Sequence, residues 1–211
     1  MIWCWYAAKP MISRAPWTDL LPRLGRRQRS CRFSMVYVTS TCCLNELNGA
    51  SSKRTEGIAT TMQDAGFAVQ VSNAVLLEMW EKWVLLATFA GMTCLMRGAV
   101  GDIVAAGAAG LTEALLEECR HIAASRDQVI RPEVLQRIRT LLTQANSTIM
   151  ASMLRDLERG ARTEADHVLG DLLDRQSELA VNSPSLLRIA YLHLKTYEAR
   201  RAREGIPSAA A

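Results

Sequence analysis

The sequence predicts a mainly helical protein, in which an all-helical domain over residues 73–204 follows a short strand–helix–strand segment over residues 42–72. Two observations predict this class. From Ser72 onward, apolar residues recur at helical spacing, and the breaks between them fall at glycines, prolines and capping residues. Before Ser72, weakly alternating residues at 43–47 and 67–71 flank a helical stretch, which is the order of a β–α–β unit.

The strand–helix–strand segment carries its own turn and cap signals. Asn48-Gly49 is a turn dipeptide, and Ser51 or Ser52 can cap a helix that we expect to end at Ala65-Gly66. One unit of this kind cannot bury both faces of its sheet. We therefore expect it to be the end of a larger α/β domain whose earlier part is missing.

The helical domain divides at residues that favour helix starts, which are serine, asparagine or threonine at cap positions and proline in a first turn. The expected helices cover about residues 73–95, 111–123, 132–142, 147–160, 163–173 and 184–203. Five of these helices have a start signal, and the helix over residues 111–123 has none. The signals are, in chain order, Ser72-Asn73, Pro132, Asn146-Ser147, Thr163 and Ser183-Pro184. In the second helix, one face is expected to be buried: Leu111, Leu115, Leu116, Cys119, Ile122 and Ala123. Its charged residues, expected outside that face, are Glu113, Glu117, Glu118 and Arg120.

Charge is divided unevenly along the chain of 211 residues. Residues 1–41 hold seven basic residues and one acidic residue, a net charge of +6, whereas the whole chain carries +4, so the remainder carries −2. A basic head can bind nucleic acid or an acidic membrane surface. The alternative is a poorly ordered or non-native head, which we favour because a basic run alone is a weak motif. We expect no nucleic-acid partner, and a frayed tail over residues 205–211.

Composition excludes several classes of protein. With 49% hydrophobic and 22% charged residues, the chain is neither disordered nor collagen-like. Its longest uncharged apolar run, residues 83–96, is shorter than the ~20 residues that span a bilayer, so we expect no membrane segment. The six cysteines form no C-x-x-C pair and the three histidines have no ligand spacing, so we expect neither a disulfide framework nor a metal site. The head lacks the pattern of a signal peptide, and we expect a cytoplasmic location.

Lys82 is the first candidate for chemistry. It lies between Trp80 and Trp83 at the edge of a strongly apolar helix, where partial desolvation makes an ammonium group a better proton donor. The alternative is a lysine that extends from the rim of the core into water.

The second candidate is the corner between two expected helices, which begins at Ser152 and ends at Thr163-Glu164. A serine hydroxyl, a carboxylate and the amide groups of a helix start could hold a small oxo acid together with a lysine. The alternative is a structural corner held by ion pairs among Asp156, Arg159 and Glu164. No two glycines stand two apart, so the chain has no dinucleotide fingerprint and no Walker A loop.

Three stretches, residues 79–87, 93–101 and 152–166, resemble the carboxy-terminal half of the ketopantoate reductases (2-dehydropantoate 2-reductases). The most specific part is Ser152-Met-Leu-Arg-Asp156 followed by Thr163-Glu-Ala-Asp166, at the family's distance after the Trp-Glu-Lys-Trp helix. Residues 44–73 are similar to the end of the family's nucleotide-binding domain, and Asn182-Ser-Pro-Ser-Leu-Leu187 to the start of its final helix. The similarity covers about residues 44–200 and leaves out the basic head.

The resemblance implies a Rossmann domain, of which residues 42–72 are a remnant, and a helical domain of the 6-phosphogluconate-dehydrogenase-like type. It implies an oxidoreductase that uses NADPH to reduce 2-dehydropantoate, a small 2-oxo acid, to pantoate for pantothenate and coenzyme A synthesis. By resemblance, Lys82 is the catalytic lysine that protonates the carbonyl oxygen, and Glu164 and Ser152 bind the substrate. Because the glycine motif for the cofactor phosphates is absent, we expect this truncated chain to bind NADPH weakly or not at all.

Three positions depart from the family's pattern. Leu86, Ala90 and Ile149 stand where the family often has asparagines that face the substrate. We therefore expect a more apolar substrate pocket, which suits a branched or bulkier 2-oxo acid. The alternative function is a non-catalytic helical module for dimerisation or interaction, and a homodimer is compatible with both functions.

Overall fold

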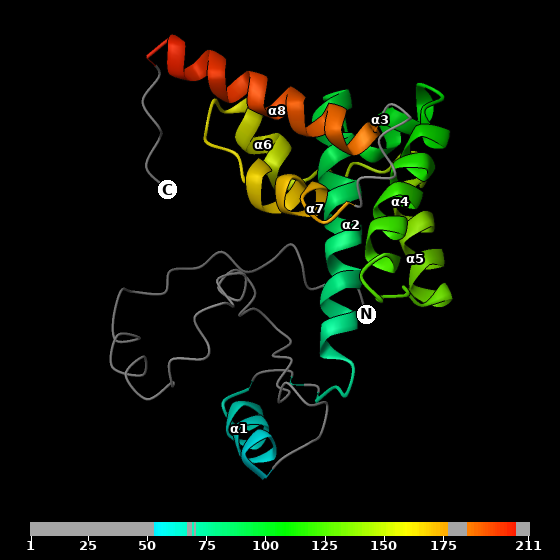
Figure 1. The fold of residues 1–211 in the computed structure, drawn as a ribbon, viewed down its shortest axis with the longest axis vertical. Coiled ribbons are helices and arrows are strands. Elements are labelled where there is room, and N and C mark those ends of the chain that lie inside the picture. The colour runs from blue at the N-terminus through cyan, green and yellow to red at the C-terminus, as the bar shows by residue number, and fades with distance from the viewer. Residues whose placement is uncertain (1–52, 67–68, 70, 177–184, 206–211) are drawn as a thin grey trace. The chain divides into compact units, whose positions relative to one another are not determined.

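The computed structural model describes residues 53–66, 69, 71–176 and 185–205, and this part of the chain is mainly helical, as the sequence predicted (Figure 1). The helices, in chain order, are α1 (Lys53–Asp64), α2 (Val75–Met96), α3 (Val100–Ala105), α4 (Ala109–Ala124), α5 (Pro132–Leu142), α6 (Ser152–Glu158), the π-helical turn η6 (Asp166–Gly170), α7 (Asp171–Leu173) and α8 (Leu186–Arg203). None of the helices in the described ranges is long and apolar enough to cross a membrane.

The chain divides into two compact units, Met1–Val75 and Leu76–Ala211. In the first unit, α1 stops at Ala65 and Gly66, as expected, and Gly66 adopts a φ of 85°, which favours glycine.

Little of the expected sheet falls within the described residues. Val69 forms an isolated bridge and Val71 has no regular structure. The expected strand over residues 43–47, the turn at residues 48–49 and the caps at residues 51–52 lie outside the described residues, as does the basic head.

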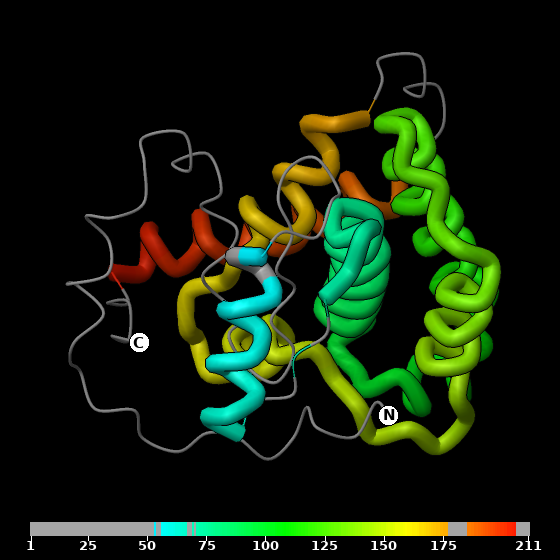
Figure 2. The backbone as a smooth tube through the Cα atoms, turned by 90° about the horizontal axis from the view of Figure 1, so that it is seen from below, coloured from blue at the N-terminus to red at the C-terminus, as the bar shows by residue number. Residues whose placement is uncertain are grey.

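In the second unit, α2 lies between the pair α4 and α5 on one side and the segment η6–α7 on the other, and α8 crosses this layer (Figures 1 and 2). Gly91 lets these helices approach α2 closely. A Cβ atom added there would lie 3.1 Å from Leu115 Cδ2, 3.6 Å from Ala190 Cβ and 3.9 Å from Leu169 Cδ2. The missing side chain therefore allows α4, α8 and η6 to meet α2 at one residue.

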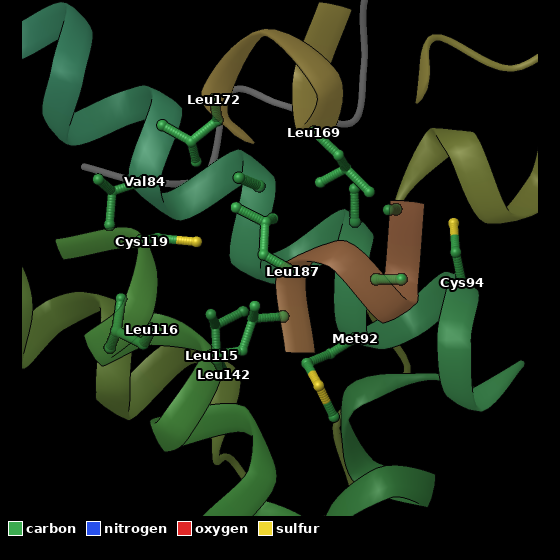
Figure 3. Packing of buried hydrophobic residues seen from close by; sticks show 14 of the residues in the cluster. Val84, Met92, Cys94, Leu115, Leu116, Cys119, Leu142, Leu169, Leu172 and Leu187 are labelled. Carbon is green, nitrogen blue, oxygen red and sulfur yellow. The ribbon is translucent and has the colours of Figure 1, made fainter. Parts of the chain in front are cut away.

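A single hydrophobic core fills the space between these helices (Figure 3). Its members come from every long helix of the second unit, and those that are essentially inaccessible to solvent include Val84, Met92, Cys94, Leu115, Leu116, Cys119, Leu169, Leu172 and Leu187. Burial raises the pKa of the thiols of Cys94 and Cys119 to about 12, so both cysteines behave as small apolar residues.

The expected helix from Asn146-Ser147 was wrong at its start. Asn146 has a φ of 58°, which is a left-handed turn conformation and not the extended one of a helix cap. The residues that follow have no regular secondary structure, and the carbonyl oxygens of Ser147 and Ile149 accept hydrogen bonds from the amides of Gly101 and Val100, at 2.8 and 3.0 Å. Because these hydrogen bonds to the start of α3 engage residues 147–149, the helix begins only at Ser152.

Two further expectations need correction. Leu111, expected in the core, is 47% exposed in the first turn of α4. Glu118, expected outside, lies against the start of α8, where its carboxylate accepts hydrogen bonds from the Ser185 hydroxyl and, at 3.2 Å, from the amide of Leu187.

The last helix begins at Leu186 with Ser185 as its cap, whose hydroxyl accepts from the amide of Arg188 at 3.0 Å. The expected start at Ser183-Pro184 lies outside the described residues, and the expected end near Arg203 is confirmed.

Candidate active site

Lys82 lies in the first half of α2, half-buried. The tryptophans on either side pack against each other, with ring centroids 5.1 Å apart and an interplanar angle of 40°. The guanidinium of Arg175 lies 4.8 Å from the centroid of the Trp83 ring. The two tryptophans beside Lys82 in the sequence therefore pack against each other, and Trp83 also packs against Arg175.

The residue before Lys82 fixes this part of α2 to the start of α5. Glu81 is 5% exposed, and its Oε1 accepts from the backbone amide and the Nε of Arg131, at 3.1 and 2.8 Å. Its Oε2 accepts from the second nitrogen of the same guanidinium at 2.5 Å. These bonds raise the pKa of Arg131 above its ordinary value.

The residue after Lys82 fixes α2 to the segment that carries Glu164. The indole Nε1 of Trp83 donates to the carbonyl oxygen of Val168 at 2.9 Å. The amide of Val168 in turn donates to the carbonyl oxygen of Glu164 at 3.0 Å. Two hydrogen bonds thus connect the backbone at Glu164 to the immediate neighbour of Lys82.

Glu164 itself is exposed, in the segment between α6 and η6. The expected cap residue Thr163 is buried, and its hydroxyl donates to Glu198 of α8 at 2.7 Å. The helix that follows opens with the π-helical turn η6, which the apolar periodicity did not predict. This arrangement presents the Glu164 side chain to solvent while its neighbours are anchored.

Ser152 belongs to a different element, the helix α6. It is exposed at the first position of α6, and the segment before it is anchored to α3 through Ser147 and Ile149. The structure thus brings the backbone segments of Lys82 and Glu164 together directly, whereas Ser152 is positioned through α3. The roles of all three side chains remain predictions.

The face of α2 that carries Lys82 has Glu78 one turn before the lysine and apolar residues after it. Met79 lies one turn before Lys82, and Leu86 and Ala90 lie about one and two turns after it; Met79 is 45% exposed, Leu86 is half-buried and Ala90 is buried. Ile149, on the segment before α6, is half-buried too. A substrate beside Lys82 would therefore meet hydrocarbon along this helix.

A separate hollow of about 320 Å³ lies along η6, α7 and α8, lined in part by Asp171, Asp174, Arg188 and Leu192. None of the three candidate side chains belongs to its lining.

Sequence patterns did not reveal the residues that hold the site in place. Trp83 was noted only as an apolar neighbour of Lys82, and Arg131 and the polar residues of α8 were not noted. Tyr191, Lys195 and Glu198 are spaced for one face of a helix, a signal that could have been found. Their partners lie 25 or more residues away in the sequence, which no local pattern reveals.

Comparison with known proteins supports the architecture. The model of the family described as "Ketopantoate reductase PanE/ApbA C terminal" matches residues 74–197, more than half of the chain. An uncharacterised oxidoreductase of Bacillus subtilis, YkpB, is 27% identical over 157 residues, which cover 74% of this chain and 52% of that protein. A 2-dehydropantoate 2-reductase of Archaeoglobus fulgidus is 26% identical over 144 residues, which cover 66% of this chain and 47% of that protein.

The fold is shared with solved structures. The crystal structure of a PanE/ApbA family ketopantoate reductase from Ralstonia eutropha superposes with a TM-score of 0.63 and 22% identity, over 72% of this chain and 50% of that one. The chain spans about half the length of the curated relatives it matches. With its C-terminal helical domain matched over residues 74–197, the chain belongs to the ketopantoate reductase family.

Proposed function

We propose that the chain supplies the substrate half of an NADPH-dependent reductase that converts 2-dehydropantoate, or a related 2-oxo acid, to the 2-hydroxy acid. The observation that carries the proposal is the bond from Trp83 to the carbonyl of Val168, which joins the helix of Lys82 to the segment of Glu164. A 2-oxo acid needs a cation near its carbonyl oxygen and polar groups near its carboxylate, and these segments offer both.

In this mechanism the Lys82 ammonium donates a hydrogen bond to the ketone oxygen and transfers its proton there as the alkoxide forms. The lysine becomes a neutral amine, and the product is the alcohol. Glu164 orients the ammonium and the substrate, and Ser152 donates its hydroxyl to the substrate. The half-buried position of Lys82 favours proton transfer because it limits competition by water.

The carbon of the ketone needs a hydride, which a reduced nicotinamide cofactor supplies when bound. The described residues of this chain do not themselves fit the pyrophosphate of such a cofactor. A dinucleotide cradle needs closely spaced glycines at a strand-to-helix turn. In this chain, Gly57 and Gly110 are glycines at which an added Cβ atom would meet nothing within 4 Å. Each is an isolated glycine inside a helix, α1 or α4, and not part of a glycine-rich turn.

The apolar face beside Lys82 favours a substrate with a hydrocarbon side chain. Leu86 and Ala90 cannot hydrogen-bond to the hydroxyl of 2-dehydropantoate, and a buried hydroxyl without a partner costs ~1–3 kcal/mol. We therefore propose that 3,3-dimethyl-2-oxobutanoate, the same acid without its hydroxyl, binds at least as tightly.

Isothermal titration calorimetry of the full chain with the two acids tests the proposal. We expect saturable binding that Lys82→Met weakens by about 10-fold or more, since a charged hydrogen bond is lost. Lys53→Met, which alters an exposed lysine of α1, is the matched control and should leave the affinity unchanged. Absence of binding, or equal affinity for Lys82→Met, would refute the proposal. With NADPH present, any turnover should fall by ~10²–10⁴ in Lys82→Met.

A second candidate is a helical interaction module without catalysis. Ile189 and Leu192 of α8 are 43% and 54% exposed and lie one turn apart, which is typical of an association surface. A stable dimer in sedimentation velocity, together with no heat of binding for either acid, would favour this function over the reductase.

A further inference from the structure

The segment that presents Glu164 is held by side chains of α8 on both sides of that residue. On one side, the hydroxyl of Thr163 donates to Glu198 Oε1 at 2.7 Å. On the other side, Lys195 Nζ donates to Asp166 Oδ2 at 3.0 Å. The two sides meet because Lys195 Nζ also donates to Glu198 Oε2 at 2.6 Å.

Two tyrosines of α8 add to this arrangement. The hydroxyl of Tyr191 donates to Asp166 Oδ1 at 2.8 Å, so both carboxylate oxygens of that residue are engaged. The hydroxyl of Tyr197 donates to the carbonyl oxygen of Ala161 at 2.9 Å. The segment over residues 161–166 therefore receives contacts from α8 at its start, middle and end.

We infer that Lys195 is a positioning residue for Glu164, because it links Glu198 and Asp166 and so fixes the backbone on both sides of the carboxylate that would meet the substrate. The inference rests on the proposed function, which gives Glu164 its role in binding the substrate. It goes beyond that function because it assigns to α8 the side chains that hold Glu164 in position. Lys195 does not need to touch the substrate to act in this way.

The hydrogen bonds favour the charged forms of Asp166 and Lys195. The hydrogen bonds from Lys195 and Tyr191 lower the pKa of Asp166 below its ordinary 3.8, and those to Glu198 and Asp166 raise the pKa of Lys195 above its ordinary 10.5. The contact between Lys195 and Glu198 is partly shielded from water, with side chains 35% and 21% exposed, whereas the side chain of Asp166 is 53% exposed. A connected set of this kind is more rigid than an isolated surface pair.

The first test needs no ligand. Amide hydrogen exchange of the full chain should become faster by about 5-fold or more at residues 163–166 in Lys195→Met, because the loss of these bonds makes local opening easier. Arg200→Met is the matched control, since it removes an exposed ion pair with Glu204 on the same helix. It should leave exchange at residues 163–166 unchanged. Equal exchange in Lys195→Met and the unaltered chain would overturn the inference.

The second test separates positioning from a general structural role. In calorimetry with 3,3-dimethyl-2-oxobutanoate, Lys195→Met should weaken binding by about 10-fold, and Lys195→Arg, which keeps the charge, should recover most of the affinity. In the Glu164→Gln background, Lys195→Met should have little further effect, since the group that it positions is already altered. Fully additive losses would overturn the inference.

The two proposals fail in different ways. If Glu164→Gln binds the acid as tightly as the unaltered chain, the proposed role of Glu164 is refuted. If Glu164→Gln weakens binding but Lys195→Met does not, the positioning role alone is refuted. Should Lys195→Met fail to fold, Tyr191→Phe removes one hydrogen bond to Asp166 and should give a smaller change in the same direction in both tests.

Discussion

The indole nitrogen of Trp83 lies 2.9 Å from the carbonyl oxygen of Val168, to which it donates a hydrogen bond across 85 residues of sequence. Val168 belongs to the π-helical turn η6, where the wider turn alters the backbone hydrogen bonding of an ordinary helix. The same indole lies beneath the guanidinium of Arg175, just after α7. Trp83 therefore contacts the polypeptide at both ends of the η6–α7 segment, and this connects α2 to the region of Glu164.

Replacement of Trp83 by phenylalanine should loosen this segment selectively. The ring remains but the donor is lost, and a net hydrogen bond contributes ~1 kcal/mol, or a factor of about 5 in a local opening equilibrium. We expect amide hydrogen exchange over residues 166–173 to accelerate by about that factor in Trp83→Phe.

Trp80→Phe is the control for this prediction. It replaces an indole on the same helix by the same smaller ring but leaves the hydrogen bond from Trp83 to Val168 in place. Acceleration over residues 166–173 that is equal in the two variants would mean that the ring volume, and not the hydrogen bond, holds the segment.

Gly101 should not tolerate a side chain, even though it lies in a helix. A Cβ atom there would lie 2.5 Å from the backbone nitrogen and 2.7 Å from the carbonyl oxygen of Ser147, so backbone must move. Such overpacking costs ~1–3 kcal/mol or more, which exceeds the ~1 kcal/mol that alanine gains over glycine in a helix. We expect Gly101→Ala to lower the free energy of unfolding in urea and to weaken binding of a 2-oxo acid, because the displaced segment leads to Ser152.

The matched control is Gly110→Ala in the first turn of α4, where an added Cβ meets nothing within 4 Å. Here alanine meets no neighbour, so only its higher helix propensity and the lower conformational entropy of the unfolded chain matter. The free energy of unfolding should therefore rise by up to about 1 kcal/mol. If the two alanine variants changed stability in the same direction, the close approach of α3 to the segment before α6 would not be the cause.

Most helices could be predicted because their signals are local. Pro132 opens α5 as expected, and the glycine after α1 ends that helix. The start of α6 could not be predicted, since the hydrogen bonds from Val100 and Gly101 that hold residues 147–149 outside a helix come from a distant part of the chain. The side chain of Asn146 is a good helix cap by composition, yet its backbone is in a turn.

The site was only partly accessible to sequence reasoning. Local context made Lys82, Ser152 and Glu164 candidates, but their roles came from the family resemblance, because a lone lysine or serine carries little local signal. The structure adds what holds them: Glu81 with Arg131 before Lys82, Trp83 with Val168 after it, and α8 around Glu164. Each of these contacts joins residues from different helices, and a helical period specifies which face is buried but not which partner lies opposite.

His193 of α8 gives the protein a predictable loss of stability in mild acid. Its Nε2 is buried and has no hydrogen-bond partner among the described residues, and burial, assisted by the charge of Arg97, lowers its pKa below the ordinary 6.5. The unfolded chain therefore takes up the proton first, so the stability that neutral His193 contributes is present above about pH 6.5 and is lost as the pH falls through the lower folded value. Urea unfolding at pH 7.5 and 5.5 should show a smaller pH dependence in His193→Gln than in the unaltered chain. His121→Gln, at an exposed position of α4, should keep the full dependence. An unchanged pH dependence in His193→Gln would assign the acid sensitivity to other groups.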